Sequence, residues 1–325
     1  MVTTRNYSFA VLGNAVVDGI AHVDDTLISQ FNLRKGDSNT LSHAQMLDLS
    51  NAITVEQFRA GGAGANTAYT LAKLGSKVAF LGQIGADPTG RFFIEDMLAA
   101  GVTLTPALTT SRTTDIFTLL SADGTRTMVQ CLPPPPSSDD SWVDDNLIEQ
   151  SHFLVIEAYV AGSHPAAAVY AAKVAAAAGT RLIVSLASPR AVQAALPVLT
   201  DIISTYNPLV IGNQSEWELL LGGNDAHMAK KLESVERVIT RSGNGAAYYA
   251  ADKGPVVDSP TQPIPKPTDL TGAGDAFAAG FLHIFTGGGS AQLALQQGHQ
   301  LGRAVVLQLG PRLQSFSEVT VPHSD

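Results

Sequence analysis

The stretch DLTGAGDAF, from Asp269 to Phe277, is the strongest signal in this sequence. A proline-rich connector leads into the stretch, and an apolar run from Ala276 to Phe285 leaves it, as is typical of a buried helix. Glycines at a helix start leave backbone N–H groups without Cβ cover. The first turn of a helix also has free N–H donors and the positive end of the helix dipole. The stretch therefore predicts a helix whose first turn binds an anion such as phosphate.

Asp275 lies just inside this predicted first turn. A carboxylate there can simply offset the helix dipole. Phosphoryl transfer needs the same arrangement, because an anion cradle stabilises the moving phosphoryl group and a carboxylate orients and deprotonates the attacking hydroxyl. Two interpretations stay open at this point, a capped helix start and a phosphoryl-transfer site.

Before this stretch, strands and helices alternate along the chain. Strands are predicted at Phe153–Ile156, Leu182–Leu186, Leu209–Ile211, Val238–Thr240 and Ala246–Ala250. Helices are predicted at about 164–178, 190–200, 215–221 and 225–234, with two more after Gly274 and at about 290–309. Such alternation predicts an α/β fold with a doubly wound, mostly parallel sheet.

The first part of the chain is organised differently. An apolar strand at 7–12 is followed by polar, broken sequence over 15–60, which suggests strands and turns outside the main core. A helix then runs from the glycine turn at 61–66 to Leu74, followed by a strand at 78–81 and a helix at about 89–100. Asp123-Gly124 joins two strand-like runs and predicts a hairpin. We expect a single unit over residues 1–325, with a small β-rich lid formed by about 13–60 and 105–130 and an α/β core formed by the remainder.

Three further segments lie where open α/β sheets bind ligands, beyond the carboxyl ends of strands. Asn213 and Glu216 are three apart, so they either cap the next helix or organise Mg²⁺ through water. The segment 240–245 is either a plain turn or a loop lying against a nucleotide. Asp18 is either a surface residue or an acceptor for ligand hydroxyls. The glycine turn GGAGAN at 61–66 is a weak signal alone, and it is neither a dinucleotide GxGxxG nor a Walker A loop.

Composition limits the possible partners. The chain has 325 residues and a net charge of −9, which argues against nucleic-acid binding and against a polybasic membrane anchor. Cys131 is the single cysteine, and the start of the chain has no apolar signal core, so we expect a cytoplasmic protein. The histidines show no zinc-binding spacing. The run Pro133–Pro136 predicts a stiff connector.

These segments, in this order, resemble the PfkB family of carbohydrate and nucleoside kinases, also called the ribokinase family. The resemblance covers nearly the whole chain. The first family signature is similar to residues 61–66 with their continuation at 81–90, and the second is similar to Asp269–Asp275. The NxxE element of the family matches Asn213 and Glu216, and its nucleotide loop is similar to Thr240, Gly243 and Gly245.

The resemblance implies a role for each matching residue. Asp275 would be the catalytic base, in an anion hole formed by Gly272, Ala273 and Gly274. The substrate hydroxyls would be held by Asn14, Asp18, Gly62 and Asn66. The nucleotide would face Asn213, Thr240, Gly243 and Gly245, and Glu216 would organise Mg²⁺ through water. A monovalent cation beside Asp269 and Thr271 is a further possibility within the family.

Two features favour the adenosine-kinase-like branch of this family. Ribokinases usually carry a lysine in the first glycine motif, where this chain has Ala63. The stretch from Asp123 to Met128 resembles the lid hairpin of adenosine kinases, in which Arg126 would approach the transferred phosphate. Glu157 begins EAY, which resembles an EGY element of bacterial relatives.

The expected function is therefore an ATP- and Mg²⁺-dependent kinase. It would transfer the γ-phosphoryl group to a primary hydroxyl of a ribose-containing nucleoside such as adenosine, acting as a monomer or homodimer. A free-sugar kinase of the ribokinase or fructokinase type is the first alternative. A catalytically weak regulator that binds a nucleoside or sugar is the second. A nucleotide-dependent dehydrogenase is disfavoured, because no GxGxxG opens a βαβ unit.

Overall fold

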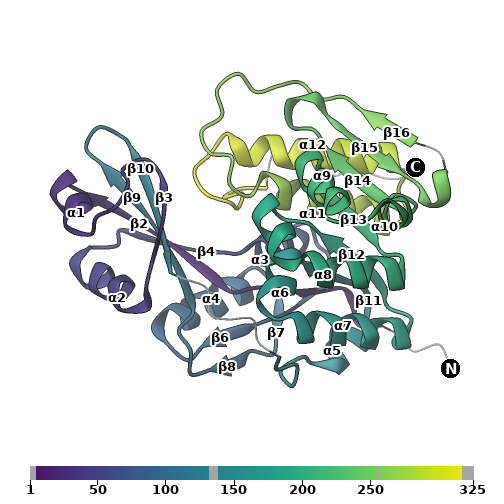
Figure 1. Cartoon of the computed structure of the whole chain (residues 1–325), viewed down its shortest axis with the longest axis horizontal. Coiled ribbons are helices and arrows are strands. Elements are labelled where there is room, and N and C mark those ends of the chain that lie inside the picture. Colours follow the sequence, from purple (N-terminus) through teal and green to yellow (C-terminus); the bar gives the residue numbers. More distant parts are fainter. Residues whose placement is uncertain (1–4, 132–137, 255, 317–325) are drawn as a thin grey trace.

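The main body is a sheet of nine strands with helices on both faces (Figure 1). The computed structural model describes residues 5–131, 138–254 and 256–316, so the predicted connector Pro133–Pro136 lies outside the described residues. Across the sheet the strands are β16 (Val256–Ser259), β15 (Ala246–Tyr249), β14 (Arg237–Thr240), β13 (Leu209–Asn213), β12 (Arg181–Ser185), β11 (Ser151–Glu157), β1 (Tyr7–Leu12), β5 (Val78–Leu81) and β7 (Thr103–Leu104).

The direction of these strands confirms the predicted fold class. All pairs from β14 to β7 are parallel, and only the β14–β15 and β15–β16 pairs, at one edge, are antiparallel. Parallel strands need crossover connections, which put helices on both faces of the sheet. The fold is a doubly wound, mostly parallel α/β fold.

Two helical layers cover the sheet. The first contains α5 (Asp145–Glu149), α6 (Ala158–Ser163), α7 (Pro165–Ala178), α8 (Pro189–Tyr206), α9 (Gln214–Gly222) and α10 (Ala226–Leu232). The second contains α3 (Ala63–Lys73), α4 (Pro88–Ala99), α11 (Ala273–Thr286) and α12 (Ala291–Val306). Along β1, Ala10 and Leu12 pack into the first layer, whereas Phe9 and Val11 pack into the second. This alternation is the two-residue period of a strand buried on both faces.

A second, five-stranded sheet stands to one side of the main body (Figure 1). Its strands, in order, are β3 (Ser38–Leu41), β10 (Arg126–Cys131), β9 (Thr114–Ser121), β2 (Val16–Val23) and β4 (Gln57–Gly61). The predicted hairpin around Asp123-Gly124 joins β9 to β10, which pair antiparallel with Leu120 opposite Arg126.

The segment 15–60 forms strands outside the main core, as expected, but its two helices were not predicted. This segment also forms α1 (Asp25–Gln30) and α2 (His43–Ala52), which cover one face of the second sheet through Ile28 and Leu49. The Asp24 side chain caps α1, and Ser42 forms a capping box with Gln45 at the start of α2. Inside the second expected lid piece, β8 (Ala107–Thr109) pairs with β6 (Gln83–Gly85) and does not join the five-stranded sheet.

The predicted helices of the main body begin and end close to their expected positions with one exception, and α6 was not predicted. Helix α8 extends past Pro197 to Tyr206, where Asn207 adopts a left-handed conformation and ends it. Within the described ranges, no helix has the length and apolar character needed to cross a bilayer.

Candidate active site

The carboxyl ends of four parallel strands bring polar residues to one edge of the main sheet. Asn14 follows β1, and Glu157, Asn213 and Thr240 are the last residues of β11, β13 and β14. Asn213 and Thr240 are direct partners in the β13–β14 pair. In open α/β sheets this edge is the usual place for a ligand.

The start of α11 has the geometry of an anion cradle. Gly272 precedes the helix with φ +78°, a conformation that favours glycine, and a Cβ there would overlap Pro311. No side chain caps α11, and within the described ranges the N–H groups of Gly274 and Asp275 donate to no protein acceptor. A Cβ built on Gly274 meets nothing within 4 Å. The first turn therefore presents free donors to an open space.

Asp275 is joined to the first glycine motif by a hydrogen bond. The Asn66 Nδ2 group donates to Asp275 Oδ2 at 2.9 Å, across 209 positions of sequence. Burial raises the pKa of Asp275 to about 6, although the Asn66 hydrogen bond and the charge of Arg312 lower it. The carboxylate is therefore ionised at neutral pH and more basic than an ordinary aspartate, which the sequence did not indicate.

Asp18 lies on β2 of the second sheet and faces the same region. The pKa of Asp18 is raised to about 6 overall. Burial is the main cause and the charge of Asp269 adds to it, whereas Arg312 and Arg59 act in the opposite direction. Gly61 lies beside it, since a Cβ on Gly61 would be 2.6 Å from Asp18 Oδ2. The glycine is required here because the carboxylate occupies the space of a side chain.

Asn14 and Gly62 lie against each other, close to the start of β2. Gly62 has φ +95°, and a Cβ on it would overlap the carbonyl oxygen of Asn14. The Asn14 Nδ2 group lies 3.3 Å from Ser163 Oγ. The four residues expected to hold substrate hydroxyls thus come from β1, β2 and the start of α3.

Glu157 is a buried carboxylate that the sequence singled out only through its resemblance to EGY. Its side chain accepts hydrogen bonds from the N–H groups of Gly64 at 2.9 Å and Val160 at 3.1 Å. Burial raises its pKa to about 7. Glu157 therefore joins the end of β11 to the starts of α3 and α6, and it fixes the backbone around the glycine motif.

Arg126 reaches from the β9–β10 hairpin to the loop before α11. Its Nη1 lies 3.8 Å from Asp269 Oδ2, and its side chain is 39% exposed. Asp269 Oδ1 accepts from the Thr271 N–H at 3.0 Å, and Oδ2 accepts from the Gly310 N–H at 3.0 Å. Burial opposes ionisation of Asp269, but these hydrogen bonds lower its pKa overall. An arginine of the second sheet therefore lies beside the glycine loop.

Asn213 and Glu216 form a capping box at the start of α9. The Asn213 backbone N–H donates to Glu216 Oε2 at 2.8 Å, and its Nδ2 donates to Oε1 at 2.6 Å. Burial raises the pKa of Glu216, and the charge of Asp275 adds to this effect. Each carboxylate oxygen keeps a second lone pair, so Glu216 can still accept from a water. These residues fit a metal held through water, and no cluster of three metal-ligating side chains occurs in the described part of the chain.

The segment 240–245 is a tight turn between β14 and β15. It contains a 3-10 turn at Ser242–Asn244, and Gly245 has φ +92°. A Cβ on Gly243 would be 3.1 Å from Pro263. An open hollow lies beyond this contact, lined by Pro260, Thr261, Gln262 and Arg303. The backbone of this segment is therefore a plain turn, as one of the two interpretations expected. The hollow next to the turn is open, so the turn does not exclude a ligand there.

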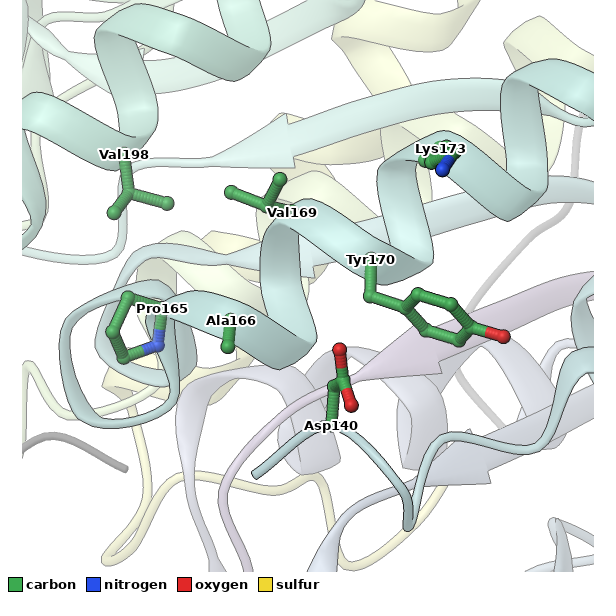
Figure 2. A pocket seen from close by; sticks show the side chains of 7 residues that line it. All are labelled: Asp140, Pro165, Ala166, Val169, Tyr170, Lys173 and Val198. Atoms are coloured by element: carbon green, nitrogen blue, oxygen red, sulfur yellow. The ribbon is translucent and has the colours of Figure 1, made fainter. Parts of the chain in front are cut away.

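A second hollow lies on the outer side of α7 and α8 (Figure 2). It is lined by Asp140, Pro165, Ala166, Val169, Tyr170, Lys173 and Val198. None of the residues predicted to act in binding or catalysis lines it. The residues predicted to hold the acceptor and to act as the base lie instead where the second sheet meets α3 and α11, and the predicted nucleotide residues lie further along the same sheet edge.

One charged residue of this region has no sequence signal. Arg312 follows α12, and its side chain is only 9% exposed. Its Nε donates to Asn66 Oδ1 at 2.9 Å. Its partners are more than 200 positions away, so no local pattern could have revealed them.

The doubly wound core and the second sheet beside its ligand-binding edge define a ribokinase-like α/β protein. The model of the family described as "pfkB family carbohydrate kinase" matches residues 38–317. The chain belongs to the pfkB family of carbohydrate kinases, which are kinases that use ATP.

Individual relatives include both nucleoside and sugar kinases. The chain is 23% identical to adenosine kinase 2 of Arabidopsis thaliana, over 95% of this chain and 97% of the relative. It is 30% identical to a probable fructokinase-7 of the same plant, over 69% of each chain. Among solved structures, adenosine kinase from Sinorhizobium meliloti is similar with a TM-score of 0.78 and 26% identity, over 95% of this chain and 96% of that one. The resemblance to the adenosine-kinase-like branch is thereby confirmed.

Proposed function

We propose that this protein transfers the γ-phosphoryl group of ATP to a primary hydroxyl of a ribose-containing nucleoside, with adenosine as the first candidate. One observation carries the proposal: the ionised, half-buried Asp275 lies at the uncapped glycine turn of α11 and accepts a hydrogen bond from Asn66 of the first glycine motif. A carboxylate with only a capping role would not need a partner from a distant glycine motif.

The reaction follows from these groups. The acceptor hydroxyl gives its proton to a free oxygen of Asp275 while its oxygen bonds to the γ-phosphorus, and the bond to the leaving ADP oxygen breaks. The N–H groups of Gly272, Ala273 and Gly274 would stabilise the charge on the transferred group, although that of Ala273 also donates to the Leu270 carbonyl at 3.3 Å. Because the transition state is loose, a base with a pKa near 6 is strong enough for the late loss of the proton.

The acceptor would lie between the two sheets. Asp18 and Asn66 offer a carboxylate and an amide to a pair of ribose hydroxyls, with Asn14 and Gly62 beside them. Arg126 would neutralise charge on the transferred phosphoryl group from the hairpin side. The five-stranded sheet would act as the lid, formed by about 13–60 and 105–130, that excludes water from the reaction.

The nucleotide would occupy the part of the sheet edge that carries Asn213 and Thr240, with the Gly243–Gly245 turn against it. Glu216 would hold Mg²⁺ through water, and the ion would supply positive charge that offsets the negative charge of the phosphates. A monovalent cation beside Asp269 and Thr271 stays a prediction.

The identity of the acceptor rests on two features of the chain. Ala63 replaces the lysine expected of a ribokinase, and the Arg126 hairpin is of the adenosine-kinase type. The similarity to adenosine kinase 2 extends over nearly the whole of both chains. A free-sugar kinase is the second candidate, because the similarity to a probable fructokinase has the higher identity. We also propose a cytoplasmic location, and a monomer or homodimer, on the basis of the sequence.

The test is a panel of acceptors with MgATP, in which ADP release is followed and the phosphorylated product is identified by mass spectrometry. Adenosine should give a higher kcat/KM than ribose, fructose or any other free sugar. The Asp275→Asn variant, purified identically, controls for contaminating kinases. A free hexose or pentose with a kcat/KM above that of every nucleoside would make the protein a sugar kinase. Binding of adenosine without turnover would support the regulator instead.

A further inference from the structure

Arg312 forms a buried contact network that begins at α4 and ends at Asp275. Its Nη1 forms an ion pair with Asp96 of α4, and its guanidinium carbon lies 4.7 Å from the centre of the Tyr69 ring of α3. Its Nε donates to Asn66 Oδ1 at 2.9 Å, and Asn66 Nδ2 donates to Asp275 Oδ2 at 2.9 Å. Four side chains thus form one chain of contacts: Asp96, Arg312, Asn66 and Asp275.

This chain of contacts has a fixed direction. A guanidinium group can only donate and an ionised carboxylate can only accept. The amide of Asn66 must therefore turn its oxygen to Arg312 and its NH₂ group to Asp275. Without the guanidinium, the Asn66 oxygen loses its donor, and the amide is held at this site only by its hydrogen bond to Asp275.

The backbone next to Arg312 is tied to the same site. The Gly310 N–H donates to Asp269 Oδ2 at 3.0 Å, and the Leu309 carbonyl accepts from Arg59 of β4. A Cβ on Gly272 would overlap Pro311. The segment 309–312 therefore contacts the second sheet, the loop before α11 and, through Arg312, helix α3.

We propose that Arg312 is a positioning residue, which acts through Asn66 to hold the Asp275 carboxylate where it can take the proton of the acceptor. This inference rests on the proposed function, because it assumes that Asp275 is the base. Arg312 itself touches neither the acceptor nor the phosphoryl group in this account.

The electrostatics of Asp275 provide a readout that a merely structural residue would not change. The charged groups that interact with Asp275 are Arg312 from the segment after α12, Glu157 at the end of β11 and Glu216 on α9. Arg312 is the cation of this set and lowers the pKa of Asp275. A protonated Asp275 cannot act as a base, so activity falls as the pH falls through its pKa. Loss of Arg312 should raise that pKa and move the acidic limb of the pH–rate profile to higher pH.

The experiment compares Arg312→Met and Arg312→Lys with the wild type, using MgATP and the best acceptor over pH 5–9. For Arg312→Met we expect kcat to fall by about 10- to 100-fold and the acidic limb to move up by about one pH unit. Arg312→Lys keeps the charge but loses the Nε donor and the flat stacking surface. In Arg312→Lys, the acidic limb of the pH–rate profile should therefore stay at its wild-type position, whereas kcat should lie between the values of Arg312→Met and the wild type. Arg190→Met, on the exposed start of α8, is the matched control and should behave as the wild type.

A double-mutant cycle tests the route of the effect. Arg312→Met and Asn66→Ala should cost less together than the product of their separate losses in kcat, because both break the same chain of contacts. An unmoved acidic limb in a folded Arg312→Met protein, or fully multiplicative losses, would overturn the proposal. If Arg312→Met does not fold, Arg312→Lys and Asp96→Asn decide it. Each of these two variants should have a clearly lower kcat while its melting temperature stays close to that of the wild type. A wild-type kcat in both would contradict the positioning role.

The failure of this inference can be separated from the failure of the proposed function. If Asp275→Asn turns over within a few-fold of the wild type, Asp275 is not the base and the proposed function itself is wrong. If Asp275→Asn is inactive but the Arg312 variants keep the wild-type limb, only the positioning role is wrong.

Discussion

Asp18 and Asp275 are two carboxylates whose pKa burial raises to about 6 in each case. A half-buried charge without a full set of partners destabilises a fold, so such residues usually serve function. Asp18 lies on the second sheet and Asp275 on the main body, and Asn66 lies next to the latter. Two carboxylates with similar pKa values are thus proposed to have different roles, one binding the acceptor and one taking its proton.

Substitution of Asp18 by alanine should mainly weaken acceptor binding. A carboxylate that accepts hydrogen bonds from two ribose hydroxyls holds substrate and transition state alike. Loss of a charged hydrogen bond costs about 1.5–3 kcal/mol, so the acceptor KM should rise by about 10- to 150-fold with a smaller change in kcat. Steady-state kinetics with adenosine measure this. An unchanged KM with a collapsed kcat would show that Asp18 has another role.

The same residue should couple stability to pH. Burial raises the pKa of Asp18 from 3.8 to about 6, so the folded state holds a proton more tightly than the unfolded state does. The wild type therefore loses stability as the pH rises from about 4 to 6. Asp18→Asn removes this loss, and its advantage in free energy of unfolding should be about 1 kcal/mol larger at pH 8 than at pH 5. Urea unfolding at both values measures it. Asp48→Asn, at an exposed position of α2, should show no such difference, and an equal gap for Asp18→Asn at both pH values would contradict the expectation.

At the scale of elements, the β9–β10 hairpin is proposed to bring Arg126 to the transferred phosphate. Arg126→Ala should lower kcat by about 10- to 150-fold, because a charge-assisted contact is lost in the transition state. The acceptor KM should change little. Arg34→Ala is a suitable control, since Arg34 lies in the same small sheet region but pairs with Asp37 in solvent. Equal kinetics for the two variants would show that Arg126 only pairs with Asp269.

The start of α11 allows a sharper test, because its two glycines are required for different reasons. Gly272→Ala places a Cβ against Pro311 at a φ of +78°, so it should lower the free energy of unfolding by about 1–3 kcal/mol. Gly274→Ala meets nothing within 4 Å and favours the helix, so stability should rise by about 0.5–1 kcal/mol. If the first turn binds phosphate, the new methyl group of Gly274→Ala should still reduce kcat by about 10- to 100-fold. A stable and fully active Gly274→Ala protein would show that α11 is merely a glycine-rich helix start.

The sequence predicted the elements that depend on local signals. Helix α11 and the β9–β10 hairpin were found because glycine placement, apolar runs and Asp-Gly turns act over a few residues. Helix α2 was missed, although the Ser42–Gln45 capping box at its start was a usable signal. Arg312 could not have been found, because its contacts with Asp96 and Asn66 depend on how four distant elements pack. The raised pKa of Asp275 was missed for the same reason, since burial is a property of the folded chain.

At the scale of the whole molecule, two sheets meet around the candidate site. The contacts between the second sheet and the main body include Arg126 with Asp269, in the loop before α11, and Arg59 with the Leu309 carbonyl, after α12. A lid that closes over the acceptor should become more rigid when the acceptor binds. Hydrogen exchange followed by mass spectrometry should therefore show slower exchange in β2, β9 and β10 with adenosine than without it. Protection confined to the nine-stranded sheet would contradict the lid role.

The central claim is that Asp275 is the base of a phosphoryl-transfer site, and single-turnover phosphorylation of the best acceptor by Asp275→Asn tests it most directly. An asparagine keeps the size of the side chain and its hydrogen bond at the helix start, so folding should survive and ATP affinity measured by calorimetry should change little. General-base catalysis contributes about 10²- to 10⁴-fold, and the rate of transfer should fall by about that factor. A rate within a few-fold of the wild type would show that Asp275 is not the base, and the mechanism proposed for this kinase would be wrong.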